Sequence, residues 1–486
     1  MERIQPGQLR DVSEIDRFDA EADVIVVGLG CAGASVLMEA CDAGADVLVL
    51  ERAGAGGGTS ANSGGLIYLG GGTPVQAAAG FDDDPEEMFK FLVAASSPGA
   101  EEDKIRLFCE DSVEHFHWFE AQGVPFKRSF HPEPSMEAIT DDCLVYSGGE
   151  DAFPYDRVAR PAPRGHKPQV PGKAGPFFMQ KMLAAVERRP ARFFWNTLVE
   201  TLVVEPSGRV VGVVARTAGE TRAFRARVGV ALAAGGFSLN EAMVRRHVPE
   251  LAMCSNKNAT DGDDGRGVRM GQGAGGEAVR MDQGEVALPS TIPHRLSRGI
   301  YVNARGQRFI NEDTYYGHVG IEALFRQAGR VYLLLDETTF ERGLVGLQPA
   351  CVGATIEEVE REAGFPAGSL QATVALYNQG AVRGEDGQFH KRPECLVPIE
   401  TPPFALVDCT AENFIYACMT LGGLRTGTNG EVLTPDGSAV AGLYAVGRTA
   451  ALFCGRGYAG SGISLADGTY FGRRAGRALA RLRDGT

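Results

Sequence analysis

The residues best suited to chemistry lie near the C-terminal end, in the segment CGRGYAGSGISLADG, residues 454–468. One tyrosine, Tyr458, and two serines, Ser461 and Ser464, stand there among glycines. Glycine has no Cβ atom, so a loop of this composition lets its backbone come close to a bound molecule. Because few apolar residues flank Tyr458, we expect its hydroxyl to hold a ligand atom instead of filling a core.

A second set of residues points to a dinucleotide. The motif GLGCAG, residues 28–33, follows a β-branched run and opens a helical one, and Glu51 ends the next apolar run. In this context Gly28 makes a tight turn, Gly30 lets backbone reach a pyrophosphate, and Gly33 allows close packing of helix on strand. Glu51 is suited to accept hydrogen bonds from ribose hydroxyls.

The loop that follows favours FAD over NAD. Residues 59–65, TSANSGG, form a polar glycine loop suited to wrapping the ribityl chain and ring of a flavin. A separate nicotinamide domain would need a second glycine motif after a strand, and the candidate MGQGAGG follows no strand. We therefore predict one FAD and no nicotinamide domain.

Length and charge narrow the class of protein. A chain of 486 residues is too long for one ordinary core, and its net charge of −14 disfavours nucleic acid and anionic membranes as partners. The ten cysteines are scattered singly, so neither a metal site nor a disulfide framework is predicted. No signal peptide and no apolar run of the ~18 residues that a membrane helix needs is visible, so we expect a cytoplasmic protein without a membrane span.

The order of the patterns predicts an α/β fold. Strand, glycine turn, helix and strand near the N-terminus indicate a Rossmann-type FAD-binding domain, and similar patterns return at the end of the chain. We predict an N-terminal lead at 1–20, an FAD-binding domain at 21–289 and 399–486, and a smaller inserted α+β catalytic domain at 290–398.

Ordered motifs along the chain carry a family resemblance: GLGCAG with Glu51, TSANSGG, ALAAGGFSLN, NATDGDDGRGVRMG, RGQRFINED, GGLRTGTNGEVLTPDGSAVAGLYAVGR and YFGRRAG. With them the chain resembles the fumarate reductase and 3-ketosteroid dehydrogenase group of flavoproteins. The resemblance implies a glutathione-reductase-like FAD domain. It also implies non-covalent FAD, because residues 59–65 hold no histidine where covalently flavinylated relatives carry one. The implied FAD-binding residues are Gly28, Gly30, Gly33, Glu51, Arg52, Thr59, Ser60, Ser63, Gly64, Gly65, Gly235, Gly236, Asp261, Gly447, Arg448, Ser464 and Leu465.

Two positions depart from the fumarate reductases. Five residues after Asn311, where those enzymes carry a proton-donating arginine, this chain has Tyr316. Ala459, beside Tyr458, replaces their carboxylate-binding arginine, although Arg456 is close in sequence. A neutral site bearing phenols does not suit a dianion, so the departures weigh against fumarate.

Tyrosine at both positions resembles the 3-ketosteroid dehydrogenases. In the Δ1 enzymes a tyrosine and the backbone N–H of a glycine four residues on hold the 3-keto oxygen, and Tyr458 and Gly462 have that spacing. The run GRT and the later Tyr-Ala-Gly-Ser-Gly look closer to the 3-oxosteroid 4-dehydrogenases, whose Tyr-x-Ser-Gly is one residue shorter. The resemblance implies catalytic roles for Tyr316, Tyr458, Ser461 and Gly462.

Desaturation next to a ketone would require such residues. The proton on the α carbon becomes removable only when the developing enolate oxygen is stabilised, as a tyrosine hydroxyl and a backbone N–H can do. Tyr316 is the expected base, with its proton relayed through Ser461 or Tyr315, and the flavin accepts the hydride from the β carbon. We therefore predict C4–C5 dehydrogenation of a hydrophobic 3-ketosteroid, with a quinone or an electron-transfer protein as electron acceptor.

Other interpretations stay open. The chain could be a 3-ketosteroid Δ1-dehydrogenase, a fumarate or urocanate reductase, or a flavin-binding electron-transfer protein with no organic substrate. Tyr315 is expected to pack in the core, and Ser461 could cap the helix that follows it. A cavity lined by both Tyr316 and Tyr458 would favour the steroid, whereas an arginine in their place would favour a carboxylate.

Overall fold

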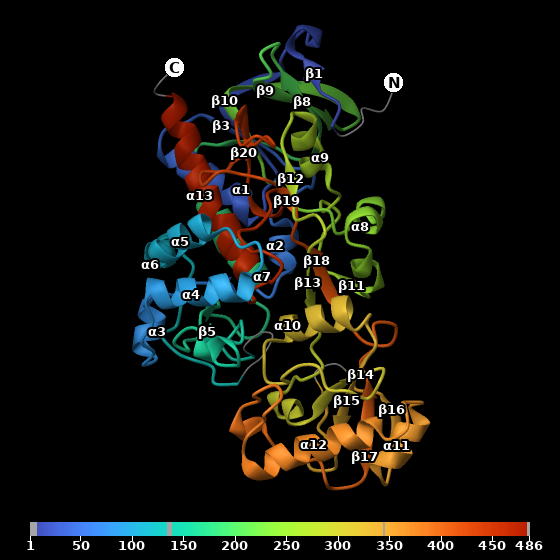
Figure 1. Ribbon diagram of the computed structural model, residues 1–486. Coiled ribbons are helices and arrows are strands. Elements are labelled where there is room, and N and C mark those ends of the chain that lie inside the picture. The colour runs from blue at the N-terminus through green and yellow to red at the C-terminus, as the bar shows by residue number, and fades with distance from the viewer. Residues whose placement is uncertain (1–6, 134–138, 344–345, 484–486) are drawn as a thin grey trace.

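The computed structural model describes residues 7–133, 139–343 and 346–483. Residues 1–6 of the predicted lead and residues 484–486 of the predicted last segment therefore lie outside the described residues. Figure 1 shows an elongated molecule, with a large sheet at one end and a smaller sheet flanked by helices at the other.

The large sheet contains the predicted Rossmann core. Its central strands β2 (Ala20–Val27), β3 (Val47–Leu50), β10 (Glu220–Leu232) and β21 (Ala439–Ala445) run parallel. Residues 24–27, 47–50 and 230–232 of these strands are continuous runs of Val, Ile, Leu and Ala because other elements cover both faces of the sheet there. The remaining strands are β1 (Arg10–Asp11), β7 (Arg192–Phe194), β8 (Thr197–Val204), β9 (Val210–Thr217) and β20 (Glu431–Leu433). The predicted α/β class is confirmed.

Strand β10 joins two parts of this sheet. Its residues 220–225 pair antiparallel with β9, and its residues 230–232 pair parallel with β21. On the other side β10 pairs with β2 along most of its length. The final segment of the chain thus returns to the sheet that the first segment began.

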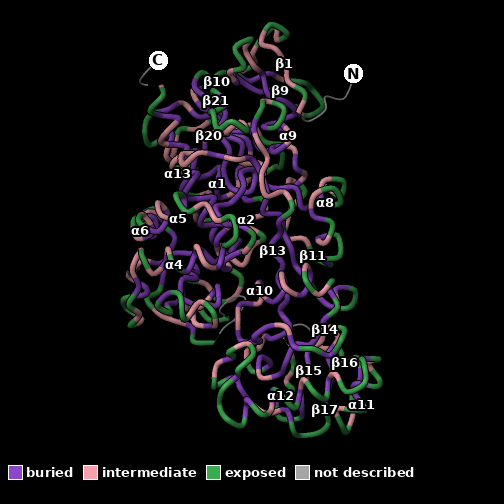
Figure 2. The backbone as a smooth tube through the Cα atoms, in the orientation of Figure 1, coloured by how far each residue is buried: buried purple, intermediate pink, exposed green. Residues whose placement is uncertain are grey.

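Helices α1 (Cys31–Asp42) and α13 (Ile463–Arg483) pack against each other beside this sheet (Figure 1). The contact is close because two glycines of α13 face the backbone of α1. A Cβ atom at Gly472 would lie 2.7 Å from the carbonyl oxygen of Ala32, and one at Gly476 would lie 2.5 Å from that of Val36. Helix α1 is accordingly almost entirely buried (Figure 2).

Two small sheets lie between the ends of the molecule. One contains β4 (Ile67–Tyr68), β6 (Gly165–His166) and β5 (Leu144–Val145), and the other contains β11 (Asn256–Lys257), β18 (Ala417–Thr420) and β13 (Gly284–Ala287). Helix α10 (Tyr316–Ile321) packs on β13. The other elements here are α2 (Gly58–Asn62), α3 (Pro74–Ala78), α4 (Pro85–Ser96), α5 (Glu102–Glu110), α6 (Ser112–Gln122), α7 (Gly175–Val186), α8 (Glu241–His247), α9 (Arg266–Gly273), β12 (Ala278–Val279) and β19 (Gly423–Leu424).

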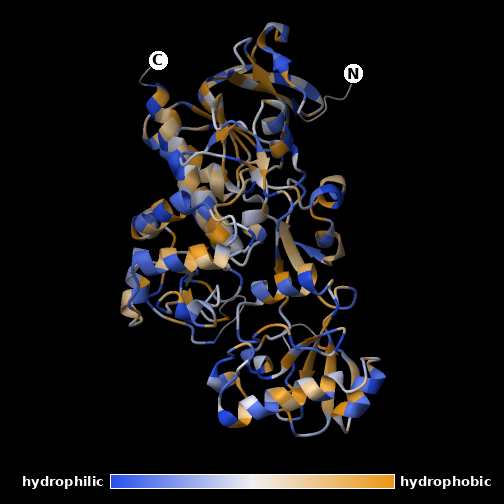
Figure 3. Cartoon of the chain, in the orientation of Figure 1, coloured by the Kyte–Doolittle hydropathy of each residue, from blue (hydrophilic) through white to orange (hydrophobic). Residues whose placement is uncertain are grey.

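The far end is an antiparallel sheet with its own core. Its strands, in spatial order, are β14 (Ile300–Asn303), β15 (Val331–Leu335), β17 (Phe404–Asp408) and β16 (Pro349–Gly353), covered by α11 (Ile356–Glu362) and α12 (Ser369–Arg383). The hydrophilic sequence of α11 places it at the surface (Figure 3). Strand β17 lies beyond residue 398, the predicted end of the inserted domain, and pairs with β15. We therefore propose that the inserted domain extends to β17.

Among the described residues, no helix combines the length and the apolar character needed to cross a membrane.

Replacing Gly472 by valine should destabilise the protein by about 1–3 kcal/mol, because the added side chain would force α13 away from α1. Denaturant unfolding of both proteins measures the difference. Gly387→Ala is the matched control, since an added Cβ there meets nothing within 4 Å. Equal stabilities of Gly472→Val and wild type would contradict the proposed packing.

Candidate active site

One cavity of about 1070 Å³ brings the predicted site residues together. It lies beside the carboxyl ends of β2 and β10 and the start of α13, and β13, β18 and α10 supply its other walls. All four predicted catalytic residues line it. Fifteen of the seventeen predicted FAD-binding residues line it as well: Gly28, Gly30, Glu51, Arg52, Thr59, Ser60, Ser63, Gly64, Gly65, Gly235, Asp261, Gly447, Arg448, Ser464 and Leu465.

The other two glycines lie behind the cavity wall. A Cβ at Gly33 would lie 2.1 Å from the carbonyl oxygen of Gly28, so Gly33 serves the packing of α1 against the turn. A Cβ at Gly236 would lie 2.8 Å from the hydroxyl of Thr420 and 3.0 Å from a carboxylate oxygen of Asp263. Neither glycine lines the cavity, and both shape its wall.

The glycine turn fits a pyrophosphate. Gly28 has φ +95°, which a residue with a side chain rarely adopts, and Gly30 precedes α1 without a capping side chain. The first N–H groups of α1 therefore lie at the end of the helix that borders the cavity, where the helix dipole favours an anion. The N–H of Cys31 donates to the hydroxyl of Ser60 (3.2 Å). Residues 59–62 of the predicted TSANSGG loop are in fact helical, as part of α2, and this bond fixes that short helix against the start of α1.

The Glu51 carboxylate is held rigidly at the end of β3. It accepts hydrogen bonds from the N–H groups of Leu29 (2.7 Å) and Ala53 (2.8 Å), and it is only 8% exposed. Its position at the cavity is that expected for a ribose-binding acid.

Asp263 is a residue of this region that the sequence analysis missed. The family resemblance implies a cofactor role for Asp261, whose backbone carbonyl oxygen accepts a hydrogen bond from Arg52 (2.7 Å). Asp263, in contrast, is buried, lines the cavity and forms an ion pair with Arg448. Both aspartates belong to the motif NATDGDDGRGVRMG, so the motif could have suggested Asp263, but only the fold shows which carboxylate meets the arginine.

Helix α10 and the glycine loop, residues 455–462, meet at Ser461. The Ser461 hydroxyl lies 2.5 Å from the hydroxyl of Tyr316 and 3.0 Å from that of Tyr315. The Ser461 N–H donates to the carbonyl oxygen of Ser147 (2.8 Å), which fixes the loop. Tyr315 is buried as expected, but its hydroxyl also reaches Ser461, so packing alone does not describe it.

Tyr458 is buried at the start of α13, and its hydroxyl is oriented by that helix. The N–H of Ser464 donates to the Tyr458 oxygen (2.9 Å), so this phenol, and not Ser461, satisfies the first turn. Because the phenol oxygen accepts this bond, its own proton is available to a ligand in the cavity. Burial raises the pKa of Tyr458, so the group stays a neutral donor.

Gly462 has a conformation and surroundings that only glycine allows. Its φ is +101°, and a Cβ atom there would lie 2.7 Å from the backbone nitrogen of Tyr68. The Tyr68 N–H donates to the carbonyl oxygen of Gly462 (3.2 Å), which attaches the glycine loop to β4.

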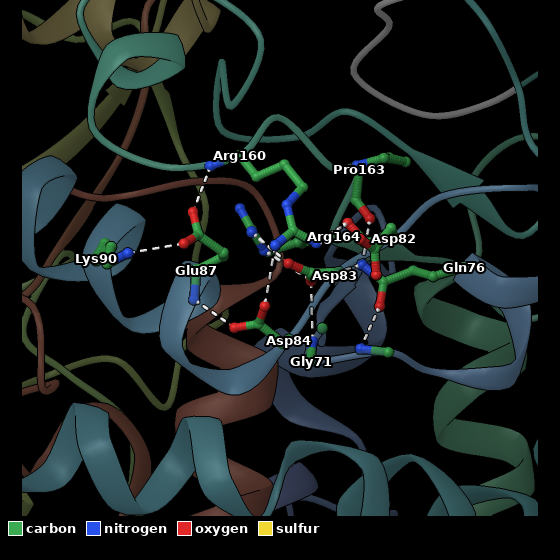
Figure 4. A network of polar contacts seen from close by, with 12 residues as sticks. Gly71, Gln76, Asp82, Asp83, Asp84, Glu87, Lys90, Arg160, Pro163 and Arg164 are labelled. Atoms are coloured by element: carbon green, nitrogen blue, oxygen red, sulfur yellow. Dashed lines mark hydrogen bonds and ion pairs between the residues drawn. The ribbon is translucent and has the colours of Figure 1, made fainter.

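A buried polar network supports β4 from behind (Figure 4). Arg164, with no exposed side-chain surface, donates to the two carboxylate oxygens of Asp83 at 2.6 and 3.1 Å, and Gln76 donates to the same group at 2.9 Å. The backbone carbonyl oxygen of Arg164 also accepts a hydrogen bond from the N–H of Leu69, next to β4. The network therefore contributes to the position of the glycine loop.

Arg456 does not supply a carboxylate-binding group. Its side chain is 67% exposed, pairs with Asp282 at 3.6 Å and does not line the cavity. The buried arginine of the cavity, Arg448, is already paired with Asp263. The corner that holds Tyr316 and Tyr458 thus has phenols where a dicarboxylate would need a cation.

The comparison with protein families decides the cofactor. A model of the FAD binding domain family matches residues 23–465. The chain belongs to this family of flavoproteins. The flavoprotein is therefore an FAD-dependent oxidoreductase, and the glycine turn, Glu51 and the TSANSGG loop are the residues that fit the cofactor.

Three relatives illustrate the range of this family. The flavoprotein is 45% identical to 3-ketosteroid Δ4-(5α)-dehydrogenase from Rhodococcus jostii RHA1, whose crystal structure is in complex with 4-androstene-3,17-dione; the two match with a TM-score of 0.93 over 97% of this chain and 99% of that chain. It is 28% identical to 3-oxo-5-alpha-steroid 4-dehydrogenase of Comamonas testosteroni, over 91% of this chain and 95% of the relative. It is also 28% identical to urocanate reductase of Eggerthella lenta, over 95% of this chain and 75% of the relative.

Replacing Gly33 by alanine should leave the protein largely without FAD, because the Cβ would displace the carbonyl oxygen of Gly28 and open the turn. The ratio of visible flavin absorbance to protein absorbance in the purified protein measures the loss. Gly387→Ala should keep a full complement of flavin. A fully loaded Gly33→Ala protein would show that this turn does not hold the dinucleotide.

Proposed function

We propose that this flavoprotein dehydrogenates a 3-ketosteroid, forming the C4–C5 double bond of a 5α-3-oxosteroid. One observation carries the proposal: Tyr316, Ser461 and Tyr458 line one cavity, with Tyr316 bonded to Ser461, although about 140 residues separate α10 from the glycine loop. The relative of 45% identity, in complex with 4-androstene-3,17-dione, supports the same substrate class.

Tyr458 and Gly462 would hold the 3-keto oxygen. The Tyr458 hydroxyl accepts from Ser464 and can donate to a ligand, and the Gly462 N–H has no recorded partner among the described residues. Preorganised donors of this kind stabilise a developing enolate oxygen by about 3–4 kcal/mol each. They lower the pKa of the adjacent C–H proton without carrying a charge themselves.

Tyr316 would take the α proton. To accept it, Tyr316 would give its own hydroxyl proton to Ser461, whose hydroxyl lies 2.5 Å from that of Tyr316 and 3.0 Å from that of Tyr315. One proton would leave along this row of hydroxyls for each α proton taken. The bound FAD supplies the hydride acceptor for the β carbon. Electrons would then leave to a quinone or an electron-transfer protein.

The carboxylate-reductase alternative has weaker support. Relatives of this chain include a urocanate reductase, so such a reaction occurs among similar proteins. The arginine that could bind a carboxylate here, Arg456, points to solvent instead. A Δ1-dehydrogenase would need the same oxygen-binding pair, Tyr458 and Gly462, so product analysis must separate the two ring bonds.

The decisive test is anaerobic mixing of the purified flavoprotein with a saturated 5α-3-ketosteroid. We expect the visible band of the oxidised flavin to bleach and a 4-ene-3-ketosteroid to form. Tyr458→Phe should reduce the rate of bleaching by about 10²–10³-fold, and Tyr316→Phe by about 10²–10⁴-fold. Both variants should retain their FAD, since neither hydroxyl is needed for the dinucleotide end of the cavity.

Tyr332→Phe is the matched control, because Tyr332 lies on β15 at the far end of the molecule and should leave the rate unchanged. A 1-ene product would favour the Δ1 alternative. If steroids leave the flavin oxidised while urocanate or fumarate reoxidises the reduced protein, the steroid proposal is wrong.

A further inference from the structure

Glu285 is an acidic side chain inside the cavity that the steroid chemistry does not use. It lies on β13, pairs across the sheet with Met419 of β18, and is 4% exposed. Side chains alternate along a strand, so Glu285 and Ala287 share one face, and both line the cavity. Val286 points the other way, into an apolar core.

The carboxyl group is poorly satisfied by the protein. Its Oε2 atom is buried and has no hydrogen-bond partner among the described residues. The cation that lowers the pKa of this carboxyl is Arg448, and that arginine already forms an ion pair with Asp263. A buried carboxylate without a partner is costly, whereas the neutral acid is not.

The charged and titratable groups around Glu285 come from several elements. Cys418 on β18 and Arg448 after β21 change the pKa of its carboxyl. Glu285 in turn raises the pKa of Cys254, of Tyr315 next to α10 and of Tyr458 in the glycine loop. Burial raises the pKa of both tyrosines, so they stay neutral. Burial and the Cys418 thiol raise the pKa of Glu285 to about 8.

We propose that Glu285 is a proton-binding site coupled to reduction of the flavin. Dehydrogenation breaks a C–H bond at the β carbon and delivers its two electrons with the hydrogen to the cofactor, which adds one negative charge to the cavity. The α proton leaves separately through Tyr316. Where Glu285 is a carboxylate, it repels the added charge, so reduction makes it bind a proton from solvent and reoxidation releases that proton.

The sign and the pH range of this coupling follow from the ionisation of Glu285. Below a pH of about 8 the carboxyl is neutral in both redox states, and reduction recruits no additional proton to it. Above that pH the oxidised protein holds a carboxylate, and the negative charge of reduction raises its proton affinity. Reduction then takes up as much as one more proton per two electrons.

The flavin midpoint potential, measured spectroelectrochemically against pH without steroid, tests this inference. Above a pH of about 8 the potential of the wild type should fall more steeply than that of Glu285→Gln, by up to about 30 mV per pH unit for a two-electron couple. Below that pH the two slopes should coincide. Cys418→Ser is the control: it keeps Glu285 and should keep the steep slope, which should begin at a lower pH because Cys418 no longer raises the pKa of Glu285.

Equal slopes for the wild type and Glu285→Gln across the whole range would overturn the inference, as would loss of the steep slope in Cys418→Ser alone. Redox-difference infrared spectroscopy of the wild type above a pH of about 8 gives a second measurement that needs no variant. A protonated-carboxyl band should appear on reduction, and its absence would also contradict us. The inference rests on the proposed function only because a steroid would supply the hydride. In this test an electrode supplies the electrons instead. Failure of the steroid reaction would therefore not affect the test.

Discussion

The site depends on direct contact between backbones at the glycine loop. A Cβ atom at Gly457 would lie 2.1 Å from the carbonyl oxygen of Ala95 on α4, and one at Gly462 would lie 2.7 Å from the nitrogen of Tyr68 on β4. Backbone atoms cannot move aside as a flexible side chain can, so the loop has one position relative to these two elements. Tyr458 takes its position from the loop, and the start of α13 then orients its hydroxyl.

Several buried charges elsewhere in the molecule are paired. Arg164 meets Asp83 behind the glycine loop, and in the inserted domain Glu312 lies between Arg308 (2.8 Å) and Lys391 (3.2 Å). Such pairs offset the cost of removing charge from water. Glu285 differs from these paired groups, because its Oε2 atom has no hydrogen-bond partner among the described residues. The corner of the cavity that holds Tyr316 and Tyr458 has phenols and no arginine, which suits a neutral, hydrophobic ligand better than a dicarboxylate.

Most of the dinucleotide end could be predicted from the sequence, because its geometry is local. The turn at Gly28, the start of α1 and the acid after β3 lie within a short βαβ segment, where residue types fix the backbone. The end that we propose for the inserted domain could not be predicted from a local pattern. Strand β17 joins the far sheet by pairing with β15, some seventy residues earlier, and no local pattern records that partner.

The sequence by itself determined the cofactor, the α/β class and the residue types of the site, because glycine turns and apolar runs act over a few residues. Only the tertiary structure decided which side chains meet. It placed Ser461 against Tyr315 and Tyr316, paired Asp263 with Arg448, turned Arg456 to solvent and left the Oε2 atom of Glu285 without a hydrogen-bond partner among the described residues. These outcomes depend on strands and loops that are far apart in the chain and are brought together by sheet pairing and burial, which spacing along a sequence does not encode.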